Sequence, residues 1–470
     1  MFLYPESATM VFTEDGHSYT YAELLNFATH LHEYMRGQAL VLCQIDSSLG
    51  GLVGYLAFAH SCQYVAMLQG VETHEAYIHC LIKKYEPDYV WVPESLREIY
   101  GDAQLVLNSY GYSLLKLSVG ETANLSDQLC LLASTSGSTG SPKFVRQSRQ
   151  NILANTVSIV EYLDLKADDV AITSLPLNYT YGMSIVNCQI AVGGDIVLTN
   201  KAVVQKEFWT LLRERKVSVL AGVPYTYEMM DRLRVFRKDL PDVKKILQAG
   251  GKMTEALQDK IGTYCQEYQK QLFIMYGQTE ATTRMSYLPP ERCLQKRGSI
   301  GVAIPNGRFK LVDTNGNEIN STEVTGELVF EGENVCMGYA DQKEHLTLGD
   351  EWSGVLYTGD LAAKDEDGYY FIKGRIKRFI KHFGLRVNLD EVESVLKKKY
   401  LAERIAVTDD NEKIIVFTEV AIDEEELKKY LTEMTEVKRA GIKVVNSTSI
   451  PSLPNGKTDY QALKTAYITQ

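Results

Sequence analysis

Short apolar runs alternate with amphipathic segments through the first three quarters of this 470-residue chain. Segments 206–215 and 254–266 have the spacing of helices that bury one face. Strands and helices in alternation are typical of parallel sheets that helices cover. The apolar runs are Leu40–Ile45, Tyr89–Val92, Val170–Ser174, Asp195–Thr199, Val217–Leu220, Lys245–Ala249 and Gln271–Met275. We therefore predict an α/β fold with a large N-terminal domain of layered, mostly parallel sheets and helices.

The pattern changes twice towards the C-terminus. From Gly298 to Phe330, short strands alternate with turns, which predicts a small antiparallel, barrel-like piece. A second change near 374–380 begins a charge-rich region whose length is within the usual domain range. We expect an N-terminal domain over 1–376 and a small, mobile α+β domain over 377–470.

The C-terminal region has its own helix and strand signals. Asn388 can cap a helix over Leu389–Lys399, with Glu391 at the reciprocal position of a capping box. Two strands are expected on either side of 409–411, and a second helix over Glu424–Met434.

Charge and cysteine usage exclude several classes of protein. The net charge of -11 argues against a nucleic-acid binder, which needs a basic face. Eight scattered cysteines without a CxxC pair indicate reduced thiols rather than a disulfide or zinc framework. The N-terminus has no basic segment typical of a signal peptide, so we expect a cytoplasmic protein.

One uncharged stretch, Leu49–Leu68, is long enough to raise the possibility of a membrane helix. It contains three glycines and His60, however, and Ser48 can cap a helix at its start. We expect a buried helix followed by a short strand over Gln63–Leu68, and no membrane span.

The stretch from Ser134 to Lys143 carries the most chemical information. It follows an apolar run and combines two glycines with six hydroxyl residues. Such a loop can wrap phosphate oxygens with its backbone N–H groups, and Lys143 adds a cation. Pro142 stands where a Walker A loop needs glycine, so this is a different kind of loop. A flexible surface linker is the alternative.

The segment resembles the phosphate-binding signature of the adenylate-forming superfamily, which includes acyl-CoA synthetases, luciferase-like enzymes and peptide-synthetase adenylation domains. Four further motifs of that family follow in the same order. They are Tyr276-Gly277-Gln278-Thr279-Glu280, Thr358-Gly359-Asp360, Gly374-Arg375-Ile376-Lys377 with Gly384-Leu385-Arg386, and Pro454-Asn455-Gly456-Lys457. The series spans Thr135 to Lys457, whereas the first 130 residues match only in general pattern.

The resemblance implies that ATP is held by three groups of residues. Thr135, Ser136, Gly137, Ser138, Thr139, Gly140 and Lys143 would bind the phosphates. Tyr276, Gly277 and Gln278 would lie at the adenine, Gly250 and Gly251 would lie between the acyl and adenine pockets, and Asp360 with Arg375 would bind the ribose or phosphate. An ionised carboxylate only accepts hydrogen bonds, which suits Asp360 to a ribose diol. Plain turns, or core packing for Tyr276, are the alternatives.

Glu280 is the expected magnesium ligand, because Mg²⁺ takes one or two carboxylates beside phosphates and waters. Thr279 can donate its hydroxyl to the α-phosphate. A solvated surface acid is the alternative for Glu280. The resemblance further implies that Lys457 bridges the carboxylate and the α-phosphate, and that Arg386 contacts phosphate. Lys377 would be the hinge on which the small domain turns between two half-reactions.

The acyl substrate is expected near Leu175–Gly182 and Gly222–Tyr225. Asn178, Tyr179, Gly182 and Pro224 would line an apolar or aromatic pocket, although the same residues can be merely packed. Many relatives have His where Asn178 or Tyr179 stands here. The acidic residue that holds an α-ammonium group in amino-acid-activating relatives is missing, which makes an amino-acid substrate less favoured.

The function implied is ATP-dependent activation of a small-molecule carboxylic acid, followed by acyl transfer to a thiol. The cofactors expected are ATP, Mg²⁺ and coenzyme A. A phosphopantetheinyl carrier protein acting in trans is the alternative acceptor and the one protein partner considered. A non-catalytic nucleotide-binding relative is a third reading, against which the presence of Lys143, Glu280, Asp360 and Lys457 together argues. No feature supports a luciferase-like oxidative activity.

Overall fold

The computed structural model describes most of the chain in two compact units. It describes residues 4, 6–35, 37–61, 63–117, 125–134, 143–376, 378–382, 385–402, 404–410, 413–435, 437–447, 449–452 and 458–468, with backbone alone at 379–382, 385, 386, 388, 391, 461 and 468. The first unit comprises Met1–Thr135, Ser141–Arg308 and Phe330–Leu356. The second comprises Ser136–Gly140, Phe309–Val329 and Tyr357–Gln470.

An eight-stranded mixed sheet lies in the first unit. Its strands in spatial order are β19 (Tyr339–Ala340), β9 (Phe144–Ser148), β8 (Leu129–Ser134), β4 (Tyr64–Gly70), β3 (Ala39–Ile45), β5 (Tyr89–Pro93), β7 (Tyr112–Lys116) and β6 (Gln104–Ser109). The four central strands, β8 to β5, are parallel. Antiparallel pairs close both sides, so that β19 lies at one edge beside β9.

A nine-stranded mixed sheet completes the β structure of this unit. Its strands in order are β16 (Val302–Ala303), β15 (Ser286–Leu288), β14 (Gln271–Tyr276), β13 (Lys245–Gln248), β12 (Val219–Gly222), β10 (Val170–Ile172), β11 (Asp195–Val197), β1 (Met10–Phe12) and β2 (Ser18–Thr20). Strands β14 through β1 are parallel, and β15, β16 and β2 are antiparallel additions at the edges.

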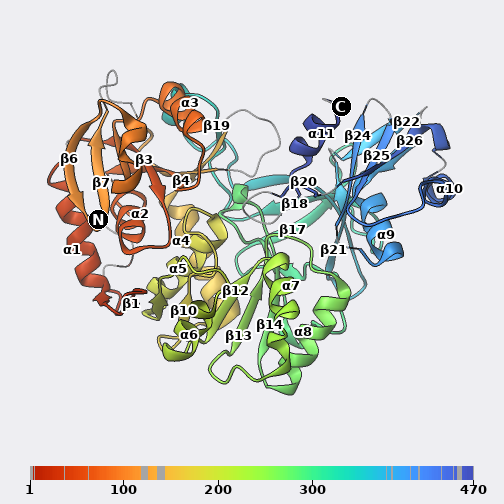
Figure 1. The fold of residues 1–470 in the computed structure, drawn as a ribbon, viewed down its shortest axis with the longest axis horizontal. Helices are drawn as coiled ribbons and strands as arrows, with labels where there is room; N and C mark the ends of the chain where they lie inside the picture. Colours follow the sequence, from red (N-terminus) through yellow and green to blue (C-terminus); the bar gives the residue numbers. More distant parts are fainter. Residues whose placement is uncertain are drawn as a thin grey trace. The chain divides into compact units, whose positions relative to one another are not determined.

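Helices connect and cover these strands, as the alternating sequence pattern predicts. Figure 1 shows α7 (Pro224–Arg232) and α8 (Glu255–Glu267) beside the strands β12 to β14. The others in this unit are α1 (Tyr21–His32), α2 (Leu49–Ala59), α3 (Glu75–Tyr85), α4 (Arg149–Leu163), α5 (Thr180–Val192) and α6 (Lys206–Glu214). Short 3-10 turns are η1 (Glu94–Tyr100), η2 (Val235–Arg237), η3 (Thr279–Ala281), η4 (Pro290–Arg292) and η5 (Lys343–Thr347). The α/β prediction and each of the seven predicted apolar strands are confirmed.

The uncharged stretch after Ser48 is a core element. Ser48 accepts a hydrogen bond from the Gly51 amide and so caps α2, as predicted. All but the first residue of α2 are buried, and β4 follows it in the parallel centre of the sheet. Within the described part of the chain, no helix is long and apolar enough to cross a membrane.

The second unit combines smaller sheets with three helices. One sheet has the order β17 (Arg308–Val312), β18 (Gly326–Glu331), β20 (Val355–Lys364) and β21 (Tyr370–Arg375), and β20 pairs with β21 antiparallel. The remaining elements are β22 (Phe379–His382), β23 (Leu385–Asn388), α9 (Leu389–Tyr400), β24 (Ile405–Asp410), β25 (Lys413–Thr418), α10 (Glu424–Thr435), η6 (Arg439–Gly441), β26 (Ile442–Asn446) and α11 (Tyr460–Ile468). The predicted C-terminal helices and strand pair are all present; the Asn388 and Glu391 side chains of the predicted capping box lie outside the described part.

Seven of the eight cysteines lie in the described part of the chain, and none of these seven forms a disulfide. Six of them are buried and Cys80 is exposed. This agrees with the expectation of reduced, mostly buried thiols.

A buried histidine sits at the end of α2. The Nε2 of His60 donates to Asn187 Oδ1 at 3.0 Å, and the Tyr55 hydroxyl donates to the same oxygen at 3.1 Å. Arg149 donates to the His60 carbonyl. Burial lowers the pKa of His60 to about 3; the bond to Asn187 acts in the opposite direction, and the Arg149 charge lowers the pKa further. His60 is therefore neutral in the folded protein at any pH well above that value.

We predict that His60 makes the first unit sensitive to mild acid. The unfolded chain takes up this proton around pH 6.5, while the folded chain takes it up only near pH 3. Acidification between these values therefore lowers the free energy of unfolding by up to about 1.4 kcal/mol per pH unit. Urea denaturation at several pH values should show a shallower pH dependence for His60→Gln, which keeps an N–H for Asn187 but does not titrate.

His17→Gln is the matched control, because the His17 side chain is 68% exposed. It should keep the pH dependence of the parent protein. Parallel pH curves for His60→Gln and the parent protein would contradict the assignment.

Candidate active site

The turn after β14 is shaped by a close approach of two backbone segments. The Met285 amide donates to the Tyr276 carbonyl at 2.9 Å, and the Thr283 amide donates to the Gln278 carbonyl at 3.1 Å. A Cβ atom on Gly277 would lie 1.6 Å from the Thr283 carbonyl oxygen. Only glycine fits there, so the motif's glycine is a structural requirement of the turn.

Two threonines, which follow Glu280 after Ala281, have backbone conformations that side chains rarely adopt. Thr282 has φ of 55° and Thr283 has φ of 111°. Positive φ in a β-branched residue is costly, and such strain concentrates at functional sites. Here it is held by the segment before β19: Thr282 Oγ1 donates to the Asn334 carbonyl at 2.7 Å, and the Cys336 amide donates to the Glu280 carbonyl at 2.9 Å. The position of Glu280 is thus over-determined by its neighbours.

Lys143 and Tyr339 meet because their strands pair. Lys143 precedes β9, and Tyr339 of β19 lies opposite Val145. The Lys143 Nζ lies 3.3 Å from the centre of the Tyr339 ring, which is a close cation–π contact. Strand pairing therefore places the predicted phosphate-binding lysine over an aromatic face.

Arg146 fixes the segment that carries Tyr339. Its guanidinium is fully buried and donates to the backbone carbonyls of Met337, Tyr339, Leu348 and Gly349 at 2.6 to 3.1 Å. It also pairs with the Glu351 carboxylate at 2.5 Å. Every N–H of this guanidinium has an acceptor, so the segment is held firmly against β9.

The hydroxyl of Tyr339 connects Lys143 to Glu280. It donates to Glu280 Oε1 at 2.8 Å. Burial, together with the neighbouring Glu280 carboxylate, raises the pKa of Tyr339, so the hydroxyl stays a donor at physiological pH. The structure thus brings two sequence-predicted residues together through a third that the sequence did not indicate.

The carboxylate of Glu280 suits a magnesium ion that a polyphosphate also binds. Tyr339 occupies one of its oxygens, and Mg²⁺ in nucleotide sites needs only one or two protein carboxylates. Among the described residues, no group of three or more His, Cys, Asp or Glu side chains could hold a metal by itself. This donor set fits a phosphate-bound ion better than a site made of protein alone.

The glycine pair and the expected acyl-pocket residues lie together in the first unit. Gly250 has φ of 83°, and a Cβ there would lie 2.8 Å from the Tyr179 hydroxyl oxygen and 3.0 Å from Val223 Cγ1. A Cβ on Gly251 would lie 3.2 Å from Pro224 Cγ. The absence of side chains at both positions lets Tyr179, Val223 and Pro224 pack closely against this turn.

Asn178 and Gly182 are placed by the same turn. Asn178 is half-buried, and Gly182 lies in the first turn of α5. A Cβ on Gly182 would lie 2.2 Å from the Pro176 carbonyl oxygen, so packing alone explains this glycine.

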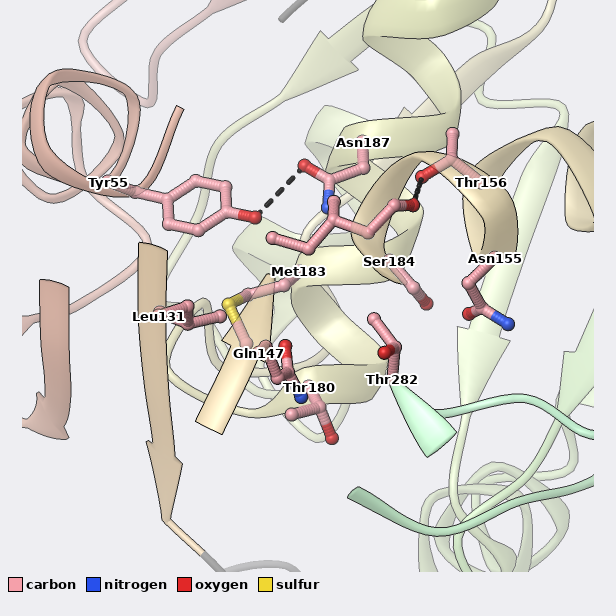
Figure 2. Close-up of a pocket in the computed structure, with 11 residues that line it drawn as sticks. Tyr55, Leu131, Gln147, Asn155, Thr156, Thr180, Met183, Ser184, Asn187 and Thr282 are labelled. Atoms are coloured by element: carbon pink, nitrogen blue, oxygen red, sulfur yellow. Dashed lines mark hydrogen bonds between the residues drawn. The ribbon is translucent and has the colours of Figure 1, made fainter. Parts of the chain in front are cut away.

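A small polar cavity lies behind this region, between β8, β9, α4 and α5. Its volume is about 10 Å³, which is room for roughly one water molecule. Figure 2 shows Asn155, Ser184 and Thr282 gathered on one side of it. The cavity is too small to hold an acyl group.

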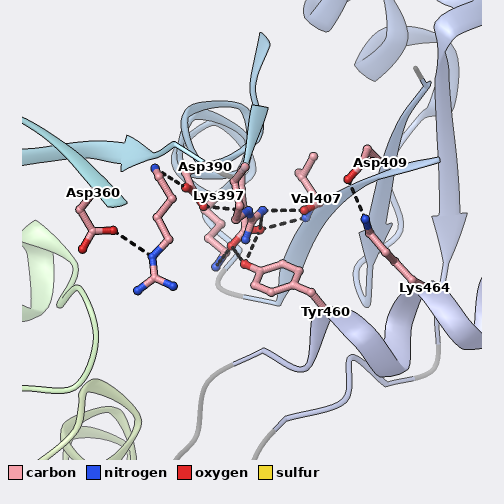
Figure 3. Close-up of polar contacts among 10 residues, drawn as sticks. Asp360, Asp390, Lys397, Val407, Asp409, Tyr460 and Lys464 are labelled. Atoms are coloured by element: carbon pink, nitrogen blue, oxygen red, sulfur yellow. Dashed lines mark hydrogen bonds and ion pairs between the residues drawn. The ribbon is translucent and has the colours of Figure 1, made fainter. Parts of the chain in front are cut away.

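Asp360 and Arg375 belong to the second unit and form an ion pair there. Arg375 Nε donates to Asp360 Oδ1 at 3.0 Å, and the Asp360 side chain is 3% exposed (Figure 3). The Arg375 amide also donates to Asp390 at 3.0 Å. The two residues assigned to the ribose are therefore neighbours across the β20–β21 pair.

A polar network continues from Asp390 to α11. Arg378 pairs with Asp390 at 3.0 Å and Glu393 at 3.3 Å, and its guanidinium lies 3.9 Å over the Tyr460 ring. The Tyr460 hydroxyl donates to Glu393 at 2.8 Å. Figure 3 shows Asp390 and Tyr460 among the side chains of this network. The start of α11, which follows the Lys457 motif, is thereby fixed to α9.

Several predicted site residues lie outside the described part of the chain. They are Thr135, Ser136, Gly137, Ser138, Thr139, Gly140, Lys377 and Lys457. Arg386 lies in β23, where only the backbone is described. Their roles remain predictions.

Two residues of this region were missed by sequence reasoning. Tyr339 is one of 29 tyrosines, and nothing in its local pattern marks it as a partner of Glu280. Arg284 left a clearer signal, since it is a single charge between the buried Ala281 and the buried strand β15.

Comparison with known proteins gives this site a context. The model of the family described as "AMP-binding enzyme" matches residues 3–340. The chain is 27% identical to 4-coumarate-CoA ligase 1 of Narcissus pseudonarcissus over 70% of its own length and 63% of that protein, so it spans less than two thirds of this curated relative.

Solved structures share the fold. ATP-bound MatB from Rhodopseudomonas palustris superposes with a TM-score of 0.77 at 21% identity, covering 98% of this chain and 96% of that one. O-succinylbenzoate coenzyme A synthetase from Bacillus subtilis, in complex with ATP and magnesium, superposes with a TM-score of 0.75 at 20% identity, covering 97% and 96%. With the family model matching well over half of its residues, the chain belongs to the AMP-binding enzyme family.

Proposed function

We propose that this protein activates a carboxylic acid with ATP and Mg²⁺ and then transfers the acyl group to the thiol of coenzyme A. The observation that carries the proposal is the Lys143–Tyr339–Glu280 contact, which joins a cation to a magnesium-type carboxylate at the end of β14. Membership of the AMP-binding enzyme family and the similarity to a 4-coumarate-CoA ligase support it.

The first half-reaction is a displacement at the α-phosphorus. A carboxylate oxygen of the acid attacks, the bond from the α-phosphorus to the bridging oxygen breaks, and pyrophosphate leaves with its negative charge. Such a reaction needs positioning and charge neutralisation more than covalent help from the protein. Magnesium, when bound, would neutralise phosphate charge beside Glu280. Lys143 would neutralise negative charge on the β- and γ-phosphates, and Thr279 would donate a hydrogen bond to the α-phosphate.

The second half-reaction replaces the adenylate by a thioester. The thiol sulfur attacks the acyl carbon, the bond to the phosphate oxygen breaks, AMP leaves, and the thiol proton passes to solvent. One site then serves two different geometries, which requires a movement of the small domain. We assign the hinge to Lys377, the domain boundary to residue 376, and the catalytic lysine of the first geometry to Lys457. Arg386 would contact phosphate in that geometry. As a separate proposal about the fold, the sheet that contains β20 and β21 would form the expected barrel-like piece.

Asp360 and Arg375 would bind the ribose. The Asp360 carboxylate already accepts from Arg375 on one oxygen, which leaves acceptor capacity for a diol. Tyr276 would stack on the adenine beside Gly277 and Gln278, and Gly250 with Gly251 would lie between the acyl and adenine pockets. The acid would lie against Tyr179 and Pro224, near Asn178 and Gly182.

A direct assay identifies the thiol that accepts the acyl group. Acids are screened by ATP-dependent hydroxamate formation, and coenzyme A or a phosphopantetheinyl carrier protein is then offered to the best acid. Thioester formation with coenzyme A supports the proposal. Formation with the carrier protein alone would replace coenzyme A by a carrier in the proposed function.

Lys457→Ala should lower pyrophosphate release in the presence of ATP, Mg²⁺ and acid by at least about 100-fold, because it removes a charge at the developing transition state. The free energy of unfolding should change by less than about 0.5 kcal/mol, because the proposed role of Lys457 is in the reaction and not in holding the fold. Lys438→Ala removes an exposed lysine of the same unit and serves as the control. Acyl-adenylate formation at the parent rate by Lys457→Ala would refute the assignment.

Tyr339→Phe tests the link between Lys143 and Glu280. The substitution keeps the ring beneath Lys143 and removes the hydrogen bond to Glu280, which is worth about 1 kcal/mol or more. Calorimetry should show roughly 5-fold weaker binding of Mg·ATP, while binding of magnesium-free AMP stays unchanged. Tyr339→Ala, which also removes the ring beneath Lys143, should lose more affinity for Mg·ATP than Tyr339→Phe.

Tyr34→Phe removes the hydroxyl of a side chain that is 43% exposed and should change neither affinity. Equal losses for Mg·ATP and AMP in Tyr339→Phe would show that Tyr339 does not act through the magnesium ligand.

A further inference from the structure

Arg284 is a fully buried guanidinium without an acidic partner. It follows Glu280 by four positions and lies on the strained turn before β15. In the described part of the chain, no carboxylate lies within ion-pairing distance of it. Buried arginines are normally paired, because an uncompensated charge inside a protein is strongly destabilising.

The hydrogen bonds of Arg284 are incomplete as well. Nη1 donates to the Tyr162 hydroxyl at 3.3 Å and contacts the Met275 sulfur, a weak acceptor, at 3.5 Å. Nη2 donates to Ser184 Oγ at 3.1 Å. Nε has no acceptor among the described residues. One N–H of Nη2 and the N–H of Nε thus remain, and these two nitrogens form one edge of the guanidinium.

Arg146 shows what a purely structural arginine looks like in this protein. Its side chain is equally buried, yet four backbone carbonyls and the Glu351 carboxylate accept from it. Arg284 has neutral hydroxyls and a sulfur instead. Every N–H group of Arg146 therefore has an acceptor, one of them a carboxylate, whereas Arg284 has no anionic acceptor among the described residues.

A chain of aromatic contacts joins Arg284 to the expected acyl pocket. The guanidinium carbon lies 4.9 Å from the centre of the Tyr181 ring, and the Tyr179 ring lies 6.2 Å from that of Tyr181. The Tyr179 hydroxyl oxygen is 2.8 Å from the Cβ position of Gly250. In this structure Tyr179 and Tyr181 fill the path, so a ligand would have to turn the half-buried Tyr179 aside.

Two polar residues that line the small cavity, Ser184 and Asn155, also lie beside Arg284. Ser184, which accepts from Nη2, also lines the small cavity of Figure 2. Asn155 lines the same cavity, donates to the Arg284 carbonyl at 2.8 Å and has a buried Oδ1 without a donor among the described residues. The Tyr162 ring, whose hydroxyl accepts from Nη1, stacks on the Tyr287 ring with 4.2 Å between their centres.

We propose that Arg284 binds a second carboxylate, at the far end of the acid that is activated. Two parallel N–H donors on one edge of a guanidinium match the two oxygens of a carboxylate. The substrate would thus be a dicarboxylic acid with an apolar or aromatic body between its two acid groups. This inference rests on the proposed function, since it names the class of acid that the same site takes.

Matched pairs of acids test the proposal. Adipate is compared with hexanoate, and 4-carboxycinnamate with 4-methylcinnamate, by ATP–pyrophosphate exchange. The parent protein should show at least about 10-fold higher kcat/KM for each diacid, the range expected for charge-assisted hydrogen bonds. Arg284→Gln should lose about 10- to 100-fold for the diacids, mainly in KM, and nothing for the monoacids. Arg284→Lys keeps the positive charge but lacks the two parallel N–H donors of a guanidinium. Its kcat/KM for the diacids should lie between the values of the parent protein and Arg284→Gln.

Arg97→Gln removes an exposed arginine and serves as the control for the substitution itself. Binding is also read without turnover: a diacid alone should raise the thermal unfolding midpoint of the parent protein but not that of Arg284→Gln. Arg284→Met should fold with an unchanged or raised midpoint, because it removes a buried, unpaired charge.

The outcomes separate the two proposals. A kcat/KM for the diacids that is equal to or lower than that for the matched monoacids overturns the role of Arg284 and leaves the proposed function standing. No exchange with any acid overturns the proposed function, and the thermal shift by diacid but not by monoacid then still decides whether Arg284 binds a carboxylate. If the glutamine variant fails to fold, the acid pairs on the parent protein decide.

Discussion

The hydroxyl of Tyr339 is the contact on which the candidate site depends. It holds the carboxylate of Glu280 at 2.8 Å, while the face of the same ring lies under the Lys143 ammonium at 3.3 Å. A single side chain thus sets the separation of a cation and an anion that lie far apart in the sequence of the first unit. Strand β19 has only two residues, and Arg146 supplies the rigidity that so short a strand lacks.

The turn after β14 places Glu280 by a different means. Gly277 lets the chain pass against the Thr283 carbonyl, and the strained conformations of Thr282 and Thr283 are held by hydrogen bonds from the segment before β19. Strain of this kind persists only where the surroundings over-determine it. The strained turn and the short strand share neighbours, so Glu280 and Tyr339 are positioned as one body.

The two buried arginines of this region differ in their hydrogen-bond acceptors. Arg146 has a full set of acceptors and ties backbone segments together. Arg284 has hydroxyls, a sulfur and an aromatic face, which solvate a guanidinium incompletely. The Nε edge of Arg284 carries a donor that the described residues do not satisfy.

The amino-acid sequence indicated the seven apolar strands, the helices α2, α6, α8, α9 and α10, and the identity of the motifs. Hydrophobic periodicity marked β3, β5 and β10 to β14, and capping chemistry placed α2, since these signals are local. The family resemblance selected Lys143, Glu280, Gly250 and Asp360 from single, short motifs.

The tertiary structure alone decided which of these side chains meet. Tyr339 lies on a two-residue strand with no periodicity to detect, and Arg284 is defined by the acceptors it lacks. Both properties arise from segments far apart in the chain that pair across a sheet edge or pack around one side chain. Local sequence pattern records the conformation of a segment, whereas contacts of this range depend on the whole fold.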